Sequence, residues 1–396
     1  MKKTMLILLS VAIILPQSHS QEKEKTTIVV DKFKLEPTGR IYVDVAKYFK
    51  DKTPLSSGAA FGDIRLGTKF SLGDKWGGKI EFGFAKSKIS YKDIFLRYNF
   101  EQSSYIRLGN YTEPFGLEYV DSSAGNKFVT SSSVSQTFAG KRNLGFEYVG
   151  WSDKFWYAGG IFADSKMASG TNLGNQGYAF SSRVVFNPLR EEGKLFHIAA
   201  AGTYRKSDAP GFQYDDNDNV IGELPRSISF SSNSETVVET RKFINSKVNK
   251  AKDQFKYNFE FIGAVGPLYT QMEYYKAHVR REESSLKSYN AEGAYGQVGF
   301  LATGGGYRYD KSWGRMLRPR PGTWEFLVRY SWVDLNDSKS EIYGGKQNDV
   351  SAAVNYYYSK YLIFRLNYTN VGLDNSSLIG KERFNAVSLR IQMIIN

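Results

Sequence analysis

The stretch TWEFLVRYSWV, residues 323–333, alternates between large apolar and polar side chains over its whole length. The apolar side chains stand at every second position and so share one face of an extended chain: Trp324, Phe326, Val328, Tyr330 and Trp332. Glu325, Arg329 and Ser331 share the opposite face. Alternation with a period of two predicts a β-strand. Its length of about ten residues exceeds the usual strand of globular proteins and suits a strand tilted across a bilayer.

The same alternation recurs along the chain. Sixteen such segments lie near residues 38–49, 60–72, 77–86, 90–100, 104–111, 142–151, 155–163, 178–187, 194–205, 254–264, 267–279, 287–303, 323–334, 347–357, 360–370 and 382–394. An even number of strands lets a barrel close with both chain ends on one side of the membrane. We therefore predict an all-β fold, a transmembrane antiparallel β-barrel of about 16 strands. A large soluble sandwich or propeller is the alternative, and strands of this length fit it less well.

The composition agrees with a membrane barrel. Aromatic residues make up 15% of the chain, with 27 Tyr and 27 Phe, yet the mean hydropathy is −0.42. After the N-terminal region the sequence has no apolar run of the roughly eighteen residues that a transmembrane helix needs. A barrel reconciles these observations, because only alternate residues of each strand face lipid.

Residues 1–20 have the pattern of a secretory signal peptide. Two lysines precede an apolar run at 5–15, and small residues at 18–20 provide a cleavage site. We expect a short periplasmic N-terminal segment at 21–37 and the outer-membrane barrel at 38–396. An N-terminal anchor is the alternative, which the polar sequence QEKEK after the signal argues against. The chain has no Cys, so no disulfide holds the exported fold.

The connections between these segments alternate in length, as they do in outer-membrane barrels. With the N-terminus in the periplasm, the long connections at 112–141, 164–177, 206–253 and 335–346 all fall on the outer side. One connection breaks the rule, because residues 304–322 are long on the periplasmic side. Either that end of the barrel is elaborated or the strand count slips there.

The third outer connection, residues 112–141, is long and rich in Ser, Thr, Gly and Asn. A barrel of about sixteen strands encloses an aqueous channel too wide to discriminate among small solutes. We therefore expect this loop to fold into the lumen and to narrow it. A floppy external loop is the alternative.

Two groups of residues resemble the phosphate-selective porin O and P family. GNYTEPFGLE at 109–118 and FAGKRNLG at 138–145 are similar to the elements with which that family's constriction loop begins and ends; the first contains Glu113, Pro114, Phe115 and Glu118. The second group starts with GTWEF at 322–326 and continues to the strand end at 355–357. The resemblance implies a sixteen-stranded barrel in the outer membrane of a Gram-negative bacterium, an inward-folded third loop, a homotrimer, and small anions such as phosphate as solutes.

Two positions depart from the pattern of that family. A basic residue often stands in the first loop element where this chain has Thr112, which weakens the expectation of phosphate selectivity. The chain also ends in MIIN, whereas outer-membrane barrels commonly end in an aromatic residue, so its assembly signal is atypical.

Charge on the inward face of the strands is the basis for predicting selectivity. By the alternation rule inward cations outnumber inward acids, and rings of Arg and Lys favour anions. Together with three cations at the third outer connection they form a set of pore-lining and anion-binding candidates: Arg40, Arg65, Lys69, Arg97, Arg107, Lys127, Lys141, Arg142, Arg183, Lys256, Arg329, Arg365 and Arg390. The inward acids by the same rule are Asp44, Glu81, Glu147, Glu260, Glu273 and Glu325. Alternatively, these arginines pair with the acids and stiffen the wall.

Other patterns are weaker. The sequence DDNDN at 215–219 has ligand types suited to Ca²⁺ but lacks EF-hand spacing, so a solvated turn is the favoured interpretation. Glycines 304–306 lack the Lys that follows in a phosphate loop. The net charge of +13 is dispersed along the strands without the patch typical of nucleic-acid binding. No catalytic, metal or cofactor site is predicted.

Two other classes of function stay open. A barrel enzyme would use His with Ser or Asp, and the exported chain has only His197 and His278, neither in a nucleophile motif. A receptor or structural barrel would bind a partner through its outer loops, for which the 206–253 connection is long enough. We expect a porin that passes small anions passively and without a cofactor.

Overall fold

A computed structural model describes residues 27–30, 32–49, 51–85, 88–101, 103–120, 125–164, 174–303, 305–376 and 380–395. The predicted signal peptide lies outside the described residues. No helix in these ranges is long and apolar enough to cross a membrane.

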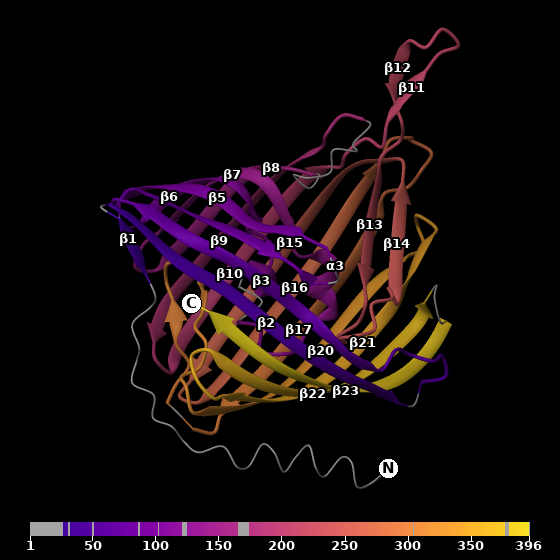
Figure 1. Cartoon of the computed structure of the whole chain (residues 1–396). Helices are drawn as coiled ribbons and strands as arrows, with labels where there is room; N and C mark the ends of the chain where they lie inside the picture. The colour runs from indigo at the N-terminus through magenta and orange to yellow at the C-terminus, as the bar shows by residue number, and fades with distance from the viewer. Residues whose placement is uncertain are drawn as a thin grey trace.

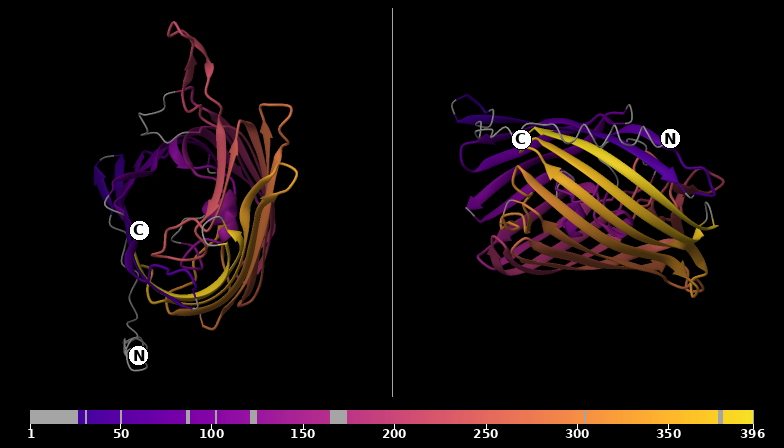
Figure 2. Two further views of the ribbon diagram at one scale, coloured as in Figure 1. Left: turned by 90° about the vertical axis from the view of Figure 1, so that its right-hand side faces the viewer. Right: turned by 90° about the horizontal axis from the view of Figure 1, so that it is seen from below.

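The strands form a closed antiparallel barrel, which Figure 1 shows from the side and the left panel of Figure 2 along its axis. Its sheet has 17 strands, of which the short β1 (Ile28–Val30) only extends one edge. The other sixteen make the wall: β2 (Phe33–Phe49), β3 (Gly58–Leu72), β4 (Trp76–Gly83), β5 (Ser90–Glu101), β6 (Ser104–Thr112), β7 (Arg142–Trp151), β8 (Phe155–Ala163), β9 (Tyr178–Glu191), β10 (Lys194–Lys206), β15 (Ala251–Val265), β16 (Leu268–Arg281), β17 (Tyr289–Leu301), β20 (Thr323–Asp337), β21 (Ile342–Tyr357), β22 (Leu362–Ser376) and β23 (Gly380–Ile395). The predicted fold class and all sixteen predicted segments are confirmed.

The first and last strands of the wall meet along a long register, which closes the barrel. Gly39 pairs with Ile395 and Phe49 with Asn385, so the last strand is paired although the chain lacks a C-terminal aromatic residue. β2 begins at Phe33 and continues through Pro37, which has no N–H to donate. Pro37 is tolerated because it lies between the residues of β2 that pair with β1 and those that pair with β23.

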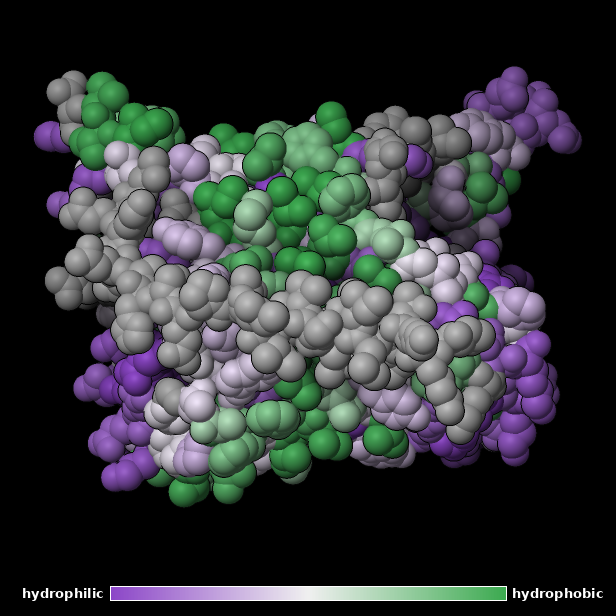
Figure 3. All heavy atoms as spheres, turned by 60° about the horizontal axis from the view of Figure 1, so that its bottom comes forward, coloured by the Kyte–Doolittle hydropathy of each residue, from purple (hydrophilic) through white to green (hydrophobic). Residues whose placement is uncertain are grey.

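The alternation separates an apolar outer face from a polar inner face. On β20 the side chains of Phe326 and Tyr330 are 46% and 49% exposed, whereas Glu325 and Arg329 are buried. Figure 3 shows apolar side chains gathered over the middle of the wall and polar ones toward its two ends. An apolar band between polar margins suits a wall that is surrounded by lipid.

Three connections carry further secondary structure. The third outer connection contains the helices α2 (Leu117–Val120) and α3 (Ser133–Phe138). The 206–253 stretch, predicted simply as a long loop, contains two hairpins, β11 (Phe212–Tyr214) with β12 (Val220–Glu223) and β13 (Ser227–Ser232) with β14 (Ile244–Asn249). The long periplasmic connection contains β18 (Tyr309–Asp310) with β19 (Arg315–Met316). That end of the barrel is therefore elaborated, and the strand count does not slip.

The largest apolar cluster lies between the long outer connections and the wall. It joins Phe115, Val134 and Phe138 of the third outer connection to Phe230 on β13 and Tyr275 on β16. The rings of Phe138 and Tyr275 stack with their centroids 6.1 Å apart. Burial of such side chains away from water is the main force that holds these connections against the wall.

Candidate functional site

Glu113 fastens the start of the third outer connection to the barrel wall. Its carboxylate accepts hydrogen bonds from Asn143 Nδ2 at 2.6 Å and from Ser181 Oγ at 2.9 Å, and it forms an ion pair with Arg205. These partners belong to β7, β9 and β10, so one carboxylate ties the connection to three strands. At Gly116 the backbone has a φ of 87°, and a Cβ there would come 2.4 Å from the hydroxyl of Tyr275, which explains the glycine.

Glu118 and its neighbours hold the next turn of the connection against β16. The N–H groups of Leu117 and Glu118 donate to the Glu273 carboxylate at 2.7 and 3.1 Å. The Glu118 carboxylate accepts hydrogen bonds from the N–H and the hydroxyl of Ser132, the N-cap residue of α3, at 2.9 and 2.8 Å. The two glutamates of the motif EPFGLE therefore bind the loop to the wall and to its own helix.

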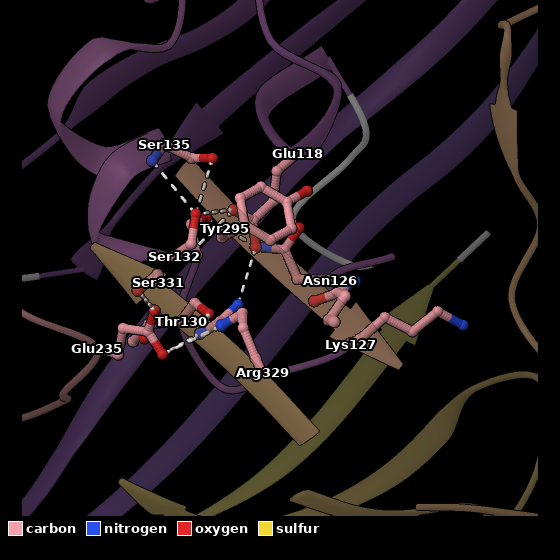
Figure 4. Close-up of polar contacts among 12 residues, drawn as sticks. Glu118, Asn126, Lys127, Thr130, Ser132, Ser135, Glu235, Tyr295, Arg329 and Ser331 are labelled. Atoms are coloured by element: carbon pink, nitrogen blue, oxygen red, sulfur yellow. Dashed lines mark hydrogen bonds and ion pairs between the residues drawn. The ribbon is translucent and has the colours of Figure 1, made fainter. Parts of the chain in front are cut away.

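Arg329 on β20 lies between two carboxylates from different connections, as Figure 4 shows. Glu118 approaches it at 3.0 Å, and Glu235, from the connection between β10 and β15, approaches it at 2.7 Å. Glu235 also accepts hydrogen bonds from Ser331 Oγ at 2.6 Å and Ser351 Oγ at 2.7 Å. Because loss of one charge would leave its partner buried and unpaired, this network fixes both connections strongly to the inward face of the wall.

Two lysines complete the contacts of the third outer connection. Lys256 on β15 donates to the backbone oxygen of Phe138 at 2.6 Å. Lys127 forms an ion pair with Glu325 on β20 at 2.8 Å, and Asn355 on β21 donates to the backbone oxygen of Lys127 at 2.7 Å. The described part of residues 113–141 thus packs on inward-facing side chains of four wall strands, β15, β16, β20 and β21.

The long periplasmic connection is fastened to the inner face from the opposite end. The indole N–H of Trp156 donates to the backbone oxygen of Ser312 at 3.1 Å, and Arg183 donates to that of Gly314 at 3.0 Å. The Nδ1 atom of His197 lies 2.7 Å from the Tyr309 hydroxyl. These wall residues stand on β8, β9 and β10, so the connection folds back over three neighbouring strands.

A cavity of about 650 Å³ lies between these two connections and the inward face of β2 to β7. Ten cationic side chains line it: Lys34, Arg40, Arg65, Lys69, Lys79, Arg97, Arg107, Arg142, Arg315 and Arg318. Four acidic side chains line it: Glu36, Glu81, Asp93 and Glu147. Low-dielectric walls focus the field of such an excess of one sign into the space between them.

Some of these cations are neutralised by nearby acids. Arg40 and Arg65 both pair with Asp63, at 2.7 and 2.9 Å, and Arg107 pairs with Glu147 at 2.5 Å. Arg97 on β5 differs, because within the described ranges it forms no ion pair and its Nε is buried without a hydrogen-bond partner. Its guanidinium lies 5.2 Å from the ring centroid of Tyr105.

Six of the thirteen predicted pore-lining cations therefore line the cavity: Arg40, Arg65, Lys69, Arg97, Arg107 and Arg142. The other seven lie elsewhere: Lys127, Lys141, Arg183, Lys256, Arg329, Arg365 and Arg390. Most of these seven cations contact wall strands or the third outer connection. For example, Arg183 pairs with Glu260 at 2.8 Å, and Arg390 pairs with Asp44 at 2.6 Å. Arg365 donates to Gln392 at 2.8 Å.

Sequence reasoning missed several residues of this site. Lys79 has the same parity as Glu81 on β4, so the alternation rule was sufficient to find it. Arg205 likewise shares the inward parity of His197 on β10 and binds Glu113. Arg315 and Arg318 carry no such signal, because they reach the cavity only through the folding of the periplasmic connection.

The acidic run at 215–219 forms a turn that satisfies its own groups. Asp215 Oδ1 accepts hydrogen bonds from the N–H groups of Asn217 and Asn219 at 2.9 and 2.8 Å. In the part of the chain that the structure describes, no group of three or more His, Asp or Glu side chains could hold a metal ion.

Comparison with known proteins agrees with this geometry. The model of the family "Phosphate-selective porin O and P" matches residues 35–395. The chain belongs to this family. It is an outer-membrane porin of a Gram-negative bacterium, and the suspected resemblance is confirmed. Porin O of Pseudomonas aeruginosa is 23% identical over 316 residues, which are 74% of this chain and 67% of that protein.

Solved structures of other porins share the fold at low sequence identity. OmpT, an outer membrane protein of Vibrio cholerae, in its trimer form, has a TM-score of 0.57 at 13% identity and covers 92% of this chain and 100% of its own. An anion-selective porin from Comamonas acidovorans has a TM-score of 0.57 at 11% identity, over 91% of this chain and 99% of its own.

Proposed function

We propose that this porin lets small anions, including phosphate and other oxyanions, diffuse passively across the outer membrane. The observation that carries the proposal is the composition of the cavity, with ten cationic and four acidic side chains. Arg97 supports it further, since it has no acidic partner among the described residues and its guanidinium can offer N–H groups to a passing oxyanion. The name of the family, and an anion-selective porin among proteins of the same fold, agree with it.

The third outer connection is proposed to lie in the lumen and to narrow the channel. Its described residues contact inward side chains of the wall, and Pro114, Tyr119 and Val120 line the cavity. The floppy external loop considered above would not bury Phe115 and Phe138 against Tyr275. Thr112 lines the same cavity where the family often has a basic residue, which favours a general anion channel over one restricted to phosphate.

A homotrimer is proposed as the assembled form. The β11–β12 hairpin projects beyond the outline of the barrel, as the left panel of Figure 2 shows. It exposes Tyr214, Val220 and Ile221, each more than half accessible. Large apolar side chains on a projecting hairpin suit contact with a neighbouring copy. We further propose that residues 1–20 direct export and are removed.

The chain is proposed to act as a channel and not as an enzyme. The His197 ring is buried against Tyr309, and His278 Nδ1 lies 2.9 Å from the side-chain oxygen of Asn290. The other ring nitrogen of His197, Nε2, lies 3.5 Å from the carboxylate of Glu260 on β15, which Arg183 also binds.

The decisive measurement is the reversal potential of the purified porin in a planar bilayer under a KCl gradient. An anion-preferring channel gives a potential of the sign set by Cl⁻, and added phosphate reduces the KCl current. A potential of the sign set by K⁺ would overturn the proposal. A receptor or structural barrel would give no steady conductance without its partner.

A further inference from the structure

The cavity has an apolar surface that a pathway for inorganic ions does not need. The two inserted connections contribute Tyr119 and Val120 from one side and Trp313, Met316 and Leu317 from the other. Leu317 is 38% exposed, and Trp313 is partly exposed. Leaving large apolar side chains in contact with water costs free energy, whereas an apolar solute that covers them recovers it.

The cations of the cavity lie over aromatic rings. The guanidinium of Arg107 lies 3.8 Å from the ring centroid of Tyr111, and that of Arg315 lies 5.0 Å from the ring centroid of Trp313. The guanidinium of Arg97 likewise lies 5.2 Å from the ring centroid of Tyr105. A guanidinium stacked in this way points the N–H groups at its edge away from the ring, and Arg97, which forms no ion pair within the described ranges, can bind a carboxylate or phosphate with them. Oxyanion-binding groups and apolar surface therefore line one space.

The apolar side chains of the periplasmic connection are held in place by the wall. Gly314, which separates Trp313 from Arg315, has a φ of 58°, a value that favours glycine. A Cβ at this position would lie 3.2 Å from the ring of Trp156 and 3.3 Å from Arg183 Nη1. The connection is thus seated closely on the wall, and Trp313 and Leu317 are fixed parts of the cavity.

We propose that the preferred solutes of this porin are organic oxyanions that carry one carboxylate or phosphate group on a flat or branched apolar body, such as aromatic carboxylates. This inference rests on the proposed anion channel and names the class of anion. The oxyanion group binds Arg97, while the apolar body covers Trp313 and Leu317. Inorganic phosphate can make only the contact with the guanidinium. An uncharged aromatic molecule can make only the contacts with Trp313 and Leu317.

The test compares two monovalent carboxylates that differ only in their apolar body. Benzoate and acetate, and inorganic phosphate as a third probe, are added as sodium salts at neutral pH to single channels in KCl, and the concentration that halves the current is measured. We expect benzoate to act at a concentration at least tenfold below that of acetate or phosphate, which corresponds to about 1.4 kcal/mol. Equal potency of benzoate and acetate would overturn the inference.

Variants locate the effect. Leu317→Ser and Trp313→Ser are expected to reduce the benzoate-to-acetate ratio at least threefold, and Trp313→Phe to restore most of it. Leu224→Ser is the matched control, because Leu224 is 40% exposed on the outer connection and does not line the cavity. A steady KCl conductance in each variant, whatever its size, shows that the barrel has assembled.

The outcomes separate the two proposals. A K⁺-selective reversal potential overturns the anion channel itself. An anion-selective channel in which benzoate has no advantage overturns only the inference about solute class. A benzoate advantage that survives both Ser variants overturns the assignment to Trp313 and Leu317.

Discussion

Glu235 and Arg329 meet at 2.7 Å although 94 positions of sequence separate them. Arg329 belongs to the wall strand β20, and Glu235 belongs to the connection between β10 and β15, so the pair joins an outer connection to the inner face of the barrel. Glu118 approaches the same arginine from the third outer connection. One wall residue therefore contacts both of these outer connections.

Neutralising Glu235 should loosen these segments. We expect Glu235→Gln to destabilise the connection by roughly 1.5–3 kcal/mol, the range for hydrogen bonds that involve a charged group. Faster protease cleavage within residues 207–250 in intact outer membranes would report the loss. Asp216→Asn, at an exposed position of the same connection, is the control and should leave the cleavage rate unchanged. Equal rates for wild type and Glu235→Gln would show that the pair does not hold the connection.

Shortening the third outer connection should widen the channel. We expect deletion of residues 120–138, with both strand ends kept, to raise single-channel conductance and to reduce ion selectivity. The reason is that Tyr119, Val120 and their neighbours line one side of the cavity. Unchanged conductance in correctly assembled protein would place the segment outside the ion pathway.

Two inward arginines should differ in their effect on selectivity. Arg97 lines the cavity, whereas Arg365 lies outside it and donates to Gln392. We expect Arg97→Gln to lower the permeability ratio of anions to cations by roughly fourfold, because a unit charge about 10 Å away in a water-filled pore changes the energies of an anion and of a cation by about 0.4 kcal/mol each, in opposite directions. Arg365→Gln should leave the ratio unchanged, and it serves as the control. The reversal potential in a KCl gradient measures the permeability ratio of each variant. Equal shifts in the two variants would contradict the conclusion that Arg97 lines the ion pathway and Arg365 does not.

A charge on the lipid-facing side should destabilise the barrel according to its depth. Phe326 on β20 is 46% exposed on the outer face of the wall, and Phe326→Arg is expected to cost roughly 2–4 kcal/mol, the range for an arginine at the middle of the bilayer. Tyr343, near the outer end of β21, is 60% exposed, and Tyr343→Arg should cost roughly 0–1 kcal/mol. Unfolding in urea from lipid vesicles measures the difference. Equal costs would mean that the two positions do not differ in membrane depth.

Acid should release part of the 207–250 connection. Hydrogen bonds from Arg241 lower the pKa of Glu239 to about 2, and Glu239 also accepts a hydrogen bond from the N–H of Ser56 at 3.1 Å. Because this pKa lies below the usual value of about 4.3, the stabilisation is fully present above about pH 4.3 and is lost as the pH falls towards 2. Pepsin should therefore cleave near Glu239 faster at pH 2 than at pH 4. Glu239→Gln should remove this dependence, and a wild-type cleavage rate that is the same at both pH values would contradict the expectation.

The strands and their two faces could be predicted from the sequence. A strand with lipid on one side and polar groups on the other must alternate with a period of two, and TWEFLVRYSWV shows this without any tertiary information. The parity of Arg97, Arg329 and Arg365 follows from the same rule, because successive side chains of a strand point to opposite faces. The periplasmic connection at 304–322 was marked by its length alone, and nothing in its sequence indicated where it would pack.

Only the tertiary structure decided which inward cations line the cavity. Arg97 and Arg329 have equal parity and lie on similar strands, yet one faces the cavity and the other is buried between Glu118 and Glu235. The difference depends on contacts between residues far apart in the sequence, such as Glu118 and Arg329, which are separated by 211 positions. The alternation of residues within one strand carries no information about such contacts. They form between side chains of the outer connections and side chains of wall strands that are distant in the sequence.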